Sequence, residues 1–213
     1  MRNTIKRSGT VQPVLQALRR DIVMGTLEDG APVTEIAFAQ AYSCSRAALR
    51  GALAVLEQEG LVTLHANGTK NISLLTEEDV NNLYRLRSYV ECSAAEQFLK
   101  HATHDISPLL KVLDQAETDS SEGFFDSDEA FHAALVSLSG NKALMQTWHT
   151  FHPLMRELFS VNLLVSGDLA VFFTDRHLKI ARRLFNGDGR AIEELASHIE
   201  EARLLSVKKF RKE

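Results

Sequence analysis

This sequence is poor in the residues that cross-link or anchor a chain. It has only two cysteines, Cys44 and Cys92, among 213 residues, and they form no CxxC pair. This excludes a disulfide framework and a cysteine-based metal pair, and it favours a reducing, cytoplasmic setting. No apolar run approaches the roughly 20 residues that cross a bilayer. The basic N-terminus MRNTIKRSGT is not followed by the apolar segment of a signal peptide. We therefore expect a cytoplasmic protein without a membrane segment.

Signatures of catalysis are missing as well. The sequence has no HExxH motif and no nucleophile elbow, and no obvious general base lies beside the metal-ligand candidates described below. A metal-dependent hydrolase of helical fold is therefore the weakest of the functions considered, and turnover by the metal-loaded protein would be its test. We expect that the protein is not an enzyme.

Proline and glycine are also scarce, at four and eleven residues. Few helix breakers favour long helices, and 45% hydrophobic with 24% charged residues is ordinary for a globular protein with a proper core. The net charge of -4 is unevenly spread. Residues 1–75 hold eight Lys and Arg against six Asp and Glu, which leaves 16 against 22 for the remainder. A mildly basic front portion is compatible with nucleic-acid binding there.

Three helices and a β-hairpin are predicted in residues 11–75. VQPVLQALRRDIVMG has a helical apolar stripe that ends at Gly25, a short helix follows at 34–41, and a third begins after Ser45 and stops at Gly60. The runs LVTLH and KNISLL flank an Asn-Gly pair, which is typical of a hairpin turn. Two helices joined by a tight turn and followed by a hairpin indicate a winged helix-turn-helix.

The helix after the turn carries the candidate DNA contacts. In a winged helix-turn-helix, the first residues of this helix meet bases in the major groove. Arg46 and Arg50 are four residues apart, so both project from one face. A guanidinium can read guanine O6 and N7 or clamp a phosphate, and Gly68 would let the wing backbone approach DNA closely. The alternative is that both arginines are merely solvated surface charges.

From Thr76 onward the pattern is helical throughout. TEEDVNNLYRLRSYVE begins with a capping threonine and three acidic residues, which the helix dipole favours at this end. Five further helices are predicted at 106–118, 125–139, 142–164, 168–186 and 188–212. The expected fold is mainly α. Its predicted parts are a disordered tail at 1–10, a winged helix-turn-helix domain at 11–75 and a six-helix antiparallel bundle for effector binding and dimerisation at 76–213.

Four polar side chains lie on or beside the predicted buried faces of the bundle. Asp128 and His132 border the apolar stripe of helix 125–139, and His177 and His198 fall on the apolar faces of the last two helices. Burial without partners would be unfavourable, and one divalent transition metal would satisfy all four. On spacing alone, hydrogen-bonded core histidines and a surface Asp–His pair remain alternatives. We interpret four further histidines as surface or partly buried: His101, His104, His149 and His152.

Together these features resemble the GntR family of bacterial transcription regulators, in the FadR-type branch whose second domain is an FCD effector domain. The resemblance covers essentially residues 11–210. Five segments carry it by their order and spacing: LRRDIVMGTLEDG, TEIAFAQAYSCSRAALRGALAVLEQEGLV, LTEEDVNNLYRLRSYVE, DEAFHAALVSLSGN and HLKIARRLFNGD. Six helices after the wing resemble the VanR-like subgroup rather than the seven-helix type.

The resemblance implies roles for particular residues. It implies a divalent transition metal (Zn, Ni or Mn) held by Asp128, His132, His177 and His198. It implies an effector pocket faced by Arg87 and Asn141, where Arg87 would clamp a carboxylate, although an ion pair between Arg87 and Glu91 is the alternative. It implies DNA contacts from Ser45, Arg46, Arg50, Gly68 and Thr69.

The sequence also departs from the family pattern. The family usually has SRTPVREAL where this chain has SRAALRGAL, and Gly51 inside the helix costs about 1 kcal/mol of helix stability. The wing NGTKN lacks the usual arginine. Arg176 stands where a glutamate usually precedes the third metal ligand, and the stretch from Gly187 to His198 is a residue short, which bears on His198 as the fourth ligand.

We therefore expect a homodimeric transcription regulator, most often a repressor in this family, on a pseudo-palindromic double-stranded DNA operator. A small carboxylate bound in the metal-containing pocket would favour one bundle arrangement and so change the operator affinity. Two alternatives stay open: a regulator that senses the metal itself, and a DNA-binding protein with a degenerate, metal-free bundle.

Overall fold

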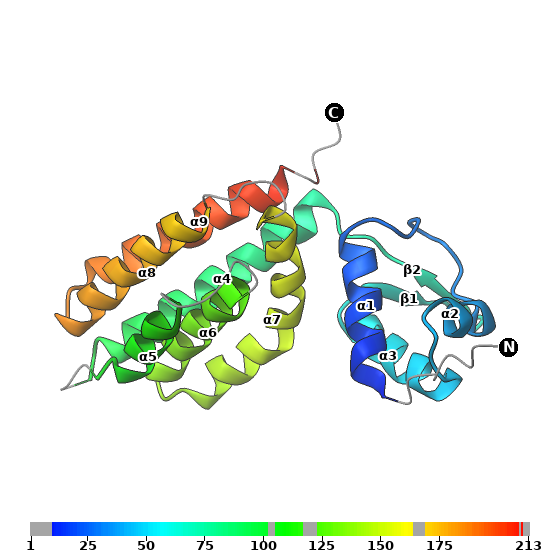
Figure 1. The fold of residues 1–213 in the computed structure, drawn as a ribbon, viewed down its shortest axis with the longest axis horizontal. Coiled ribbons are helices and arrows are strands. Elements are labelled where there is room, and N and C mark those ends of the chain that lie inside the picture. Colours follow the sequence, from blue (N-terminus) through cyan, green and yellow to red (C-terminus); the bar gives the residue numbers. More distant parts are fainter. Residues whose placement is uncertain (1–9, 102–104, 117–122, 164–168, 209, 211–213) are drawn as a thin grey trace, which may run out of the picture. The chain divides into compact units, whose positions relative to one another are not determined.

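The computed structural model describes residues 10–101, 105–116, 123–163, 169–208 and 210, so all but the last residue of the predicted disordered tail lies outside the described residues. The chain divides into two compact units, Met1–Thr76 and Glu77–Glu213. The predicted fold class is confirmed, because the described part is mainly helical, with a helix-turn-helix unit followed by a helical bundle (Figure 1).

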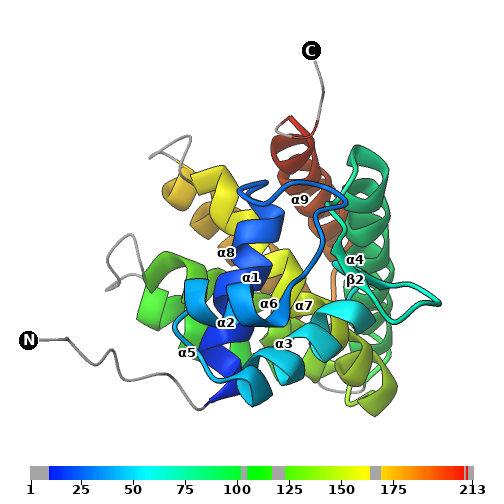
Figure 2. The same cartoon turned by 90° about the vertical axis from the view of Figure 1, so that its right-hand side faces the viewer.

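Within the described residues, the first unit consists of three helices and one hairpin (Figure 2). Its elements are α1 (Val11–Val23), α2 (Glu35–Ala41), α3 (Arg46–Gln58), β1 (Val62–Leu64) and β2 (Lys70–Ile72). The two strands pair antiparallel, with Val62 opposite Ile72 and Leu64 opposite Lys70. α3 packs against α1, α2 and β1, so the helix predicted to meet DNA rests on the other elements of this unit.

Local hydrogen bonds fix the start of α3 and the turn of the wing. Ser45 is the N-cap of α3, and its Oγ accepts a hydrogen bond from the N–H of Ala48 at 3.1 Å, as the sequence predicts. In the hairpin, Gly68 has a φ of 81°, a left-handed conformation that favours glycine. Its N–H donates to the carbonyl oxygen of His65 at 2.8 Å, which closes the turn.

A largely buried ion pair joins α1 to the end of α3. The guanidinium of Arg19 donates from Nε to Glu59 Oε2 at 2.8 Å and from Nη2 to Glu59 Oε1 at 2.6 Å. Their side chains are only 6% and 11% exposed. A bidentate pair of this kind fixes direction as well as distance, so it sets how α3 lies across α1.

Gly51, the departure noted inside α3, has a packing reason. A Cβ added at this position would lie 2.8 Å from Val11 Cγ2 and 3.4 Å from Val11 Cγ1. A side chain at position 51 would therefore require Val11, the first residue of α1, to shift. Glycine at position 51 lowers the helix propensity of α3 but leaves room for the side chain of Val11.

Six helices form the second unit within the described residues. They are α4 (Glu77–Phe98), α5 (Ser107–Ala116), α6 (Gly123–Leu138), α7 (Lys142–Leu163), α8 (Leu169–Phe185) and α9 (Arg190–Val207). α4 packs against α6, α7 and α9, and α8 packs against α5 and α9. α6 contacts α8, α8 contacts α9, and α4 contacts both α6 and α9, so these four helices surround one interior (Figure 1).

The buried face of α4 is unusual because it includes two charged residues. Val80, Tyr84, Val90 and Phe98 are buried there, as expected for a bundle helix. Arg87 and Glu91 are buried on the same helix, at 4% and 0% exposure. A buried charge requires a partner, so this face of α4 points to the polar site described below.

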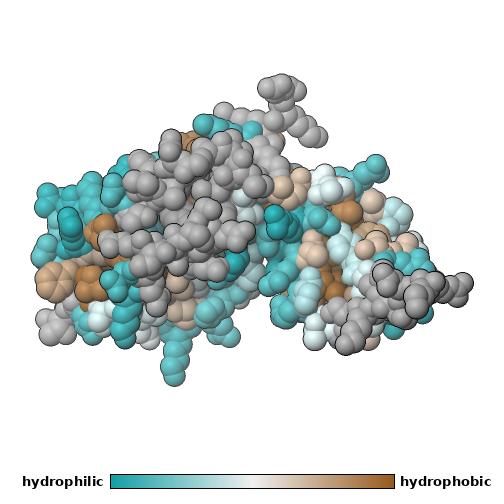
Figure 3. All heavy atoms as spheres, in the orientation of Figure 1, coloured by the Kyte–Doolittle hydropathy of each residue, from teal (hydrophilic) through white to brown (hydrophobic). Residues whose placement is uncertain are grey.

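The molecular surface is mostly polar where it can be seen. On the face drawn in Figure 3, hydrophilic residues dominate the coloured surface, and the hydrophobic patches are small and separate. The most exposed large apolar side chains are Tyr89 at 75%, Phe185 at 63% and Ile36 at 60%. Across the described residues, none of the helices combines the length and apolar character needed to span a membrane.

We predict that the Val11–Gly51 contact offsets helix propensity. Gly51→Ala should gain less than the roughly 1 kcal/mol expected from propensity, because the new methyl group meets Val11. In a Val11→Ala background, the same substitution should recover the full gain. Urea unfolding of the four proteins of this double-mutant cycle measures the difference. Equal effects of Gly51→Ala in both backgrounds would contradict the packing explanation.

Candidate metal centre and nucleic-acid interface

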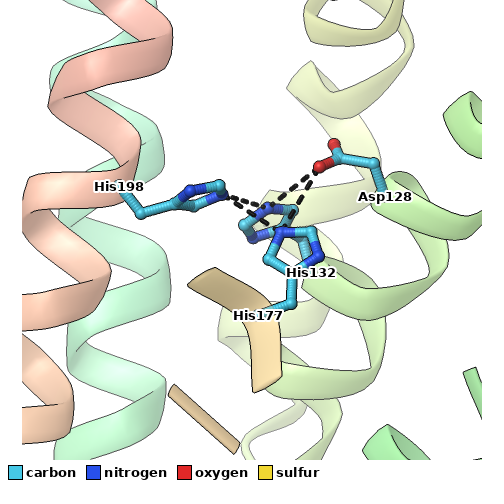
Figure 4. Close-up of side chains that lie close together, drawn as sticks. All are labelled: Asp128, His132, His177 and His198. Carbon is cyan, nitrogen blue, oxygen red and sulfur yellow. Dashed lines mark hydrogen bonds and ion pairs between the residues drawn. The ribbon is translucent and has the colours of Figure 1, made fainter. Parts of the chain in front are cut away.

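Three helices bring one carboxylate and three imidazoles together in the interior of the bundle. Asp128 and His132 come from α6, His177 from α8 and His198 from α9, and their side chains converge on one point (Figure 4). All four residues are buried, with exposures of 6% or less. One ligand atom from each lies within 4.8 Å of the others. The structure therefore brings together the four residues that were predicted from the sequence as metal ligands.

The distances between the donor atoms suit a metal ion. His198 Nε2 lies 3.1 Å from His177 Nε2 and 3.2 Å from His132 Nε2. Asp128 Oδ1 lies 3.4 Å from His177 Nε2 and 3.7 Å from His132 Nε2. Nitrogen donors about 2.0–2.1 Å from a common metal are about 3 Å apart. Asp128 Oδ1 is also buried without a hydrogen-bond partner in the described part of the chain, so this donor set fits a divalent cation.

Glu91 on α4 fixes the orientation of His132. Its Oε2 lies 2.6 Å from His132 Nδ1, and its Oε1 accepts from Arg87 Nε at 2.6 Å. Because a carboxylate accepts at Nδ1, the ring proton lies on Nδ1 and Nε2 presents its lone pair to the site. A carboxylate that accepts from the second ring nitrogen is the usual partner of a metal-bound histidine. From the sequence, Glu91 was expected only as a possible ion-pair partner of Arg87. Its position on the buried face of α4 could have indicated a second partner inside the bundle.

Burial and neighbouring charges set the protonation of the metal-free site. Burial lowers the pKa of His177 to about 3, and burial followed by the nearby His177 lowers the pKa of His198 well below its ordinary value. Burial opposes ionisation of Asp128, yet the adjacent His132 imidazole holds the Asp128 pKa well below its usual range. Burial likewise opposes protonation of His132, but Glu91 and Asp128 raise its pKa. Neutral imidazoles beside an ionised carboxylate are the forms that bind a metal.

Aromatic rings wall the site. Phe131 is fully buried and stacks on His177 with ring centroids 4.0 Å apart. Trp148 is 2% exposed and lies 6.3 Å from the ring of His132. Low-polarity walls strengthen the electrostatic interactions of charged groups inside the site.

A network of ion pairs joins α8 to α9. It gives a structural role to Arg176, which stands where the family usually has a glutamate. Arg176 donates to Glu194 Oε1 at 2.6 Å and to Glu201 Oε1 at 2.7 Å, both on α9. It directly precedes His177, and its two partners flank His198 in the sequence. The short turn before α9 is completed by Asp188, which accepts from the N–H of Arg190 at 3.0 Å. His198 therefore reaches the site despite the shortened stretch.

The two predicted effector residues already have partners within the unit. Arg87 forms the buried ion pair with Glu91, which is the arrangement that the sequence left as an alternative. Asn141 Oδ1 accepts from the N–H groups of Ala143 and Leu144 at 2.9 and 3.2 Å, so it caps the start of α7. Its Nδ2 donates to Gln97 Oε1 at 2.9 Å.

The remaining bundle histidines lie outside the cluster. His101 and His149 are exposed, and His104 lies outside the described residues. His152 is partly buried and lies 2.9 Å from Glu129 Oε1. The four ligand candidates are thus distinguished from the other histidines by their burial and by the convergence of their donor atoms.

The candidate nucleic-acid interface lies at the start of α3 and at the wing. The side chains of Arg46 and Arg50 are 58% and 61% exposed, and both contact Glu35 at the start of α2. Ser45 caps α3, and its hydroxyl hydrogen is still able to donate to a phosphate. Gly68 and Thr69 are exposed at the hairpin tip. Glu35 was not singled out from the sequence, because its contacts with the two arginines cross from one helix to the next.

Comparison with known families matches both units. The family described as "FCD domain" matches residues 82–201, and the family described as "Bacterial regulatory proteins, gntR family" matches residues 10–69. Together these matches cover the bundle with its four ligand candidates and the unit that contains α1 to α3.

Individual relatives agree with the family match. The gluconate operon transcriptional repressor of Bacillus subtilis (strain 168) is 26% identical over 169 residues, which are 76% of this chain and 68% of that protein. The HTH-type transcriptional repressor RspR of Escherichia coli (strain K12) is 25% identical over 210 residues, covering 95% and 90%. The crystal structure of a GntR regulator from Rhodococcus sp. RHA1 is 26% identical with a TM-score of 0.65, covering 94% of this chain and 99% of that chain. These are transcription regulators and not enzymes, which confirms the expectation from the missing catalytic motifs.

We predict that Glu91→Gln weakens divalent-metal binding about 10- to 100-fold, because the neutral amide no longer raises the basicity of His132 or fixes its tautomer. Competition with a chromophoric chelator for Zn²⁺ or Ni²⁺ measures the affinity. Glu129→Gln is the matched control, since Glu129 is a partly buried carboxylate on α6 that contacts the non-cluster His152. Equal affinities of the two variants would show that Glu91 does not orient the ligand.

Proposed function

The chain belongs to the GntR family of bacterial regulatory proteins and carries an FCD domain, and from this premise we propose that it is a homodimeric repressor controlled by a small carboxylate. One observation carries the proposal. A single chain combines two exposed arginines at the start of α3 with a buried Asp–His₃ set in its bundle. We also assign it to the FadR-type branch and the VanR-like subgroup, on the six helices of the described bundle.

DNA binding is assigned to α3 and the wing. Arg46 and Arg50 would read guanine edges or contact phosphates in the major groove. Ser45 would bind a phosphate beside them, and the hairpin residues Gly68 and Thr69 would follow the DNA backbone. We place this activity on the chromosome in the cytoplasm.

The bundle is assigned a metal-containing effector site. Asp128, His132, His177 and His198 would hold a divalent transition metal, Zn, Ni or Mn. When bound, the metal would supply a Lewis-acidic position for a carboxylate oxygen. Burial keeps the imidazoles of His177 and His198 neutral, and Glu91 orients the imidazole of His132, whose proton a bound metal would displace.

Charge balance supports an anionic effector. When the imidazoles are neutral, the buried guanidinium of Arg87 and the carboxylates of Glu91 and Asp128 together carry one negative charge. A divalent cation with neutral imidazoles would change this to one positive charge, which a monocarboxylate would neutralise. Glu91 occupies Arg87 Nε, so we assign the Arg87 Nη groups to the effector. Asn141 is the second assigned pocket residue, and an effector would compete with Gln97 for its amide.

Control of DNA binding would follow from linkage between the two units. A ligand that binds one arrangement of the bundle more tightly shifts the population toward that arrangement. In a homodimer, the shift would alter the separation of the two winged helices and therefore their fit to a pseudo-palindromic operator. The coupling acts in both directions, so operator DNA would change effector affinity by the same factor.

A second candidate is a regulator that senses the metal itself. Its support is that the three imidazoles and Asp128 supply four donors, the number of ligands that a structural zinc site would take. Four protein donors would satisfy zinc without an effector, whereas Ni or Mn would take further ligands, such as a carboxylate. The metal preference and the identity of the releasing signal therefore separate the two candidates.

We predict that the protein selects a discrete palindrome from the DNA of its own host. Recovery of bound genomic fragments at moderate salt, followed by sequencing, identifies the site. Arg46→Ala and Arg50→Ala should each weaken binding to it about 10- to 100-fold, through the loss of about 1–3 kcal/mol. Arg182→Ala is the control, since Arg182 is an exposed arginine of α8. Diffuse binding by the wild-type protein would contradict an operator-specific repressor.

We further predict that carboxylates, and not metal removal, control release from this site. Titration of the metal-loaded complex with a panel of small carboxylates, followed by fluorescence anisotropy of the operator, should find at least one compound that shifts the affinity by 5- to 150-fold, the usual range of allosteric coupling. Asp128→Ala should remove the shift. Release by a chelator alone, with no response to any carboxylate, would favour the metal-sensing candidate.

A further inference from the structure

A single carboxylate holds both candidate DNA-reading arginines in the DNA-free protein. Glu35 Oε2 accepts from Arg46 Nη2 at 3.1 Å, and Glu35 Oε1 accepts from Arg50 Nε at 2.7 Å. Glu35 is the first residue of α2, and the arginines lie on α3, so the contact bridges the two helices of the helix-turn-helix. All three side chains are accessible to solvent, at 33%, 58% and 61% exposure.

The bridge persists at physiological pH. Hydrogen bonds from Arg50 and then Arg46 lower the pKa of Glu35 to about 2. Glu35 therefore stays ionised well below neutrality, and the three groups together carry one positive charge rather than two. An approaching phosphate meets about half of the attraction that two unpaired arginines would exert.

Stability is a poor explanation for this bridge. Exposed ion pairs contribute little to folding, because solvent screens the charges and long side chains lose freedom when they are held. The α2–α3 turn is already fixed by the Ser45 cap. What the bridge does change is the geometry and charge of the two side chains assigned to DNA.

The contact leaves a defined edge of each guanidinium for an incoming acceptor. With Nε of Arg50 engaged by Glu35, its Nη1 and Nη2 form the edge that remains for guanine O6 and N7. A single phosphate is attracted less strongly to these arginines than to unpaired ones, because Glu35 already neutralises part of the charge of each arginine. Base edges that match the held geometry are thus favoured over the uniform DNA backbone.

We propose that Glu35 is a specificity-determining residue, which holds Arg46 and Arg50 for base readout and reduces their attraction to nonspecific DNA. This rests on the proposed function, in that α3 must be the helix that reads the operator. The partner chemistry is double-stranded DNA, and Glu35 acts on it through the two arginines.

The experiment compares Glu35→Gln with the wild-type protein on two duplexes. One duplex carries the genomic site that the wild-type protein selects, and the other is a scrambled duplex of the same length and composition. Affinities of the full-length protein are measured across a salt series. Glu28→Gln is the control, since it makes the same charge change at an exposed residue of the α1–α2 loop.

For Glu35→Gln we expect binding to the scrambled duplex to tighten about tenfold at moderate salt, and its log–log salt slope to steepen by about one counterion. Binding to the selected site should change less than threefold, so the ratio of the two affinities falls. Glu28→Gln should keep that ratio within twofold, and the unfolding midpoints of both variants should match that of the wild-type protein.

Two results would overturn the inference, and they are distinguishable. If the wild-type protein selects no site, the proposed function fails and this inference fails with it. If the wild-type protein is selective but Glu35→Gln retains its affinity ratio, or weakens both duplexes equally, DNA recognition stands and the assignment of Glu35 is wrong.

Discussion

The carboxylate of Glu91 is fully buried between the guanidinium of Arg87 and the imidazole of His132, and the bundle depends on this contact. A buried ion is tolerated only when its partners compensate for lost hydration. Glu91 meets this condition by using one oxygen for each partner. The same contacts tie α4 to α6 and set the tautomer of a ligand candidate. The carboxylate of Glu91 therefore contributes both to the packing of α4 against α6 and to the orientation of a candidate metal ligand.

The rest of the site extends this arrangement to α8 and α9. Asp128 and His132 come from one helix, so their relative placement is local, whereas His177 and His198 must be brought in by packing. Arg176 performs this task by bridging two carboxylates of α9. The ring of Phe131 then stacks on His177 and excludes water. The donor set is thus held on one side by a partly buried ion network and on the other by aromatic contacts.

Helix periodicity and turn chemistry were enough to predict the fold class and the order of the elements. They also placed Asp128 and His132 on one face, because that relation lies within a single helix. Periodicity within one helix does not predict which residues of two different helices contact each other. The link from Glu91 to His132 spans 41 residues, and that from Glu35 to Arg50 spans 15. From the sequence, Gly51 only lowered the stability of its helix, and its contact with Val11 of α1 could not be predicted. What the sequence could not supply was the partner on the neighbouring helix.

Glu91 and Glu35 engage arginines in the same way but in different surroundings, and this difference decides what each can control. At Glu91 both charges are desolvated, so the proposed effector at the Arg87 Nη groups would meet a guanidinium that a strong buried interaction already holds in place. At Glu35 water screens the pair, so Glu35 holds the two arginines only weakly while their remaining N–H groups meet a base or phosphate. The buried bridge is suited to a switch between two bundle arrangements. The exposed bridge is suited to graded discrimination among DNA sequences, because small differences in acceptor geometry are comparable with the small energy of a solvent-screened ion pair.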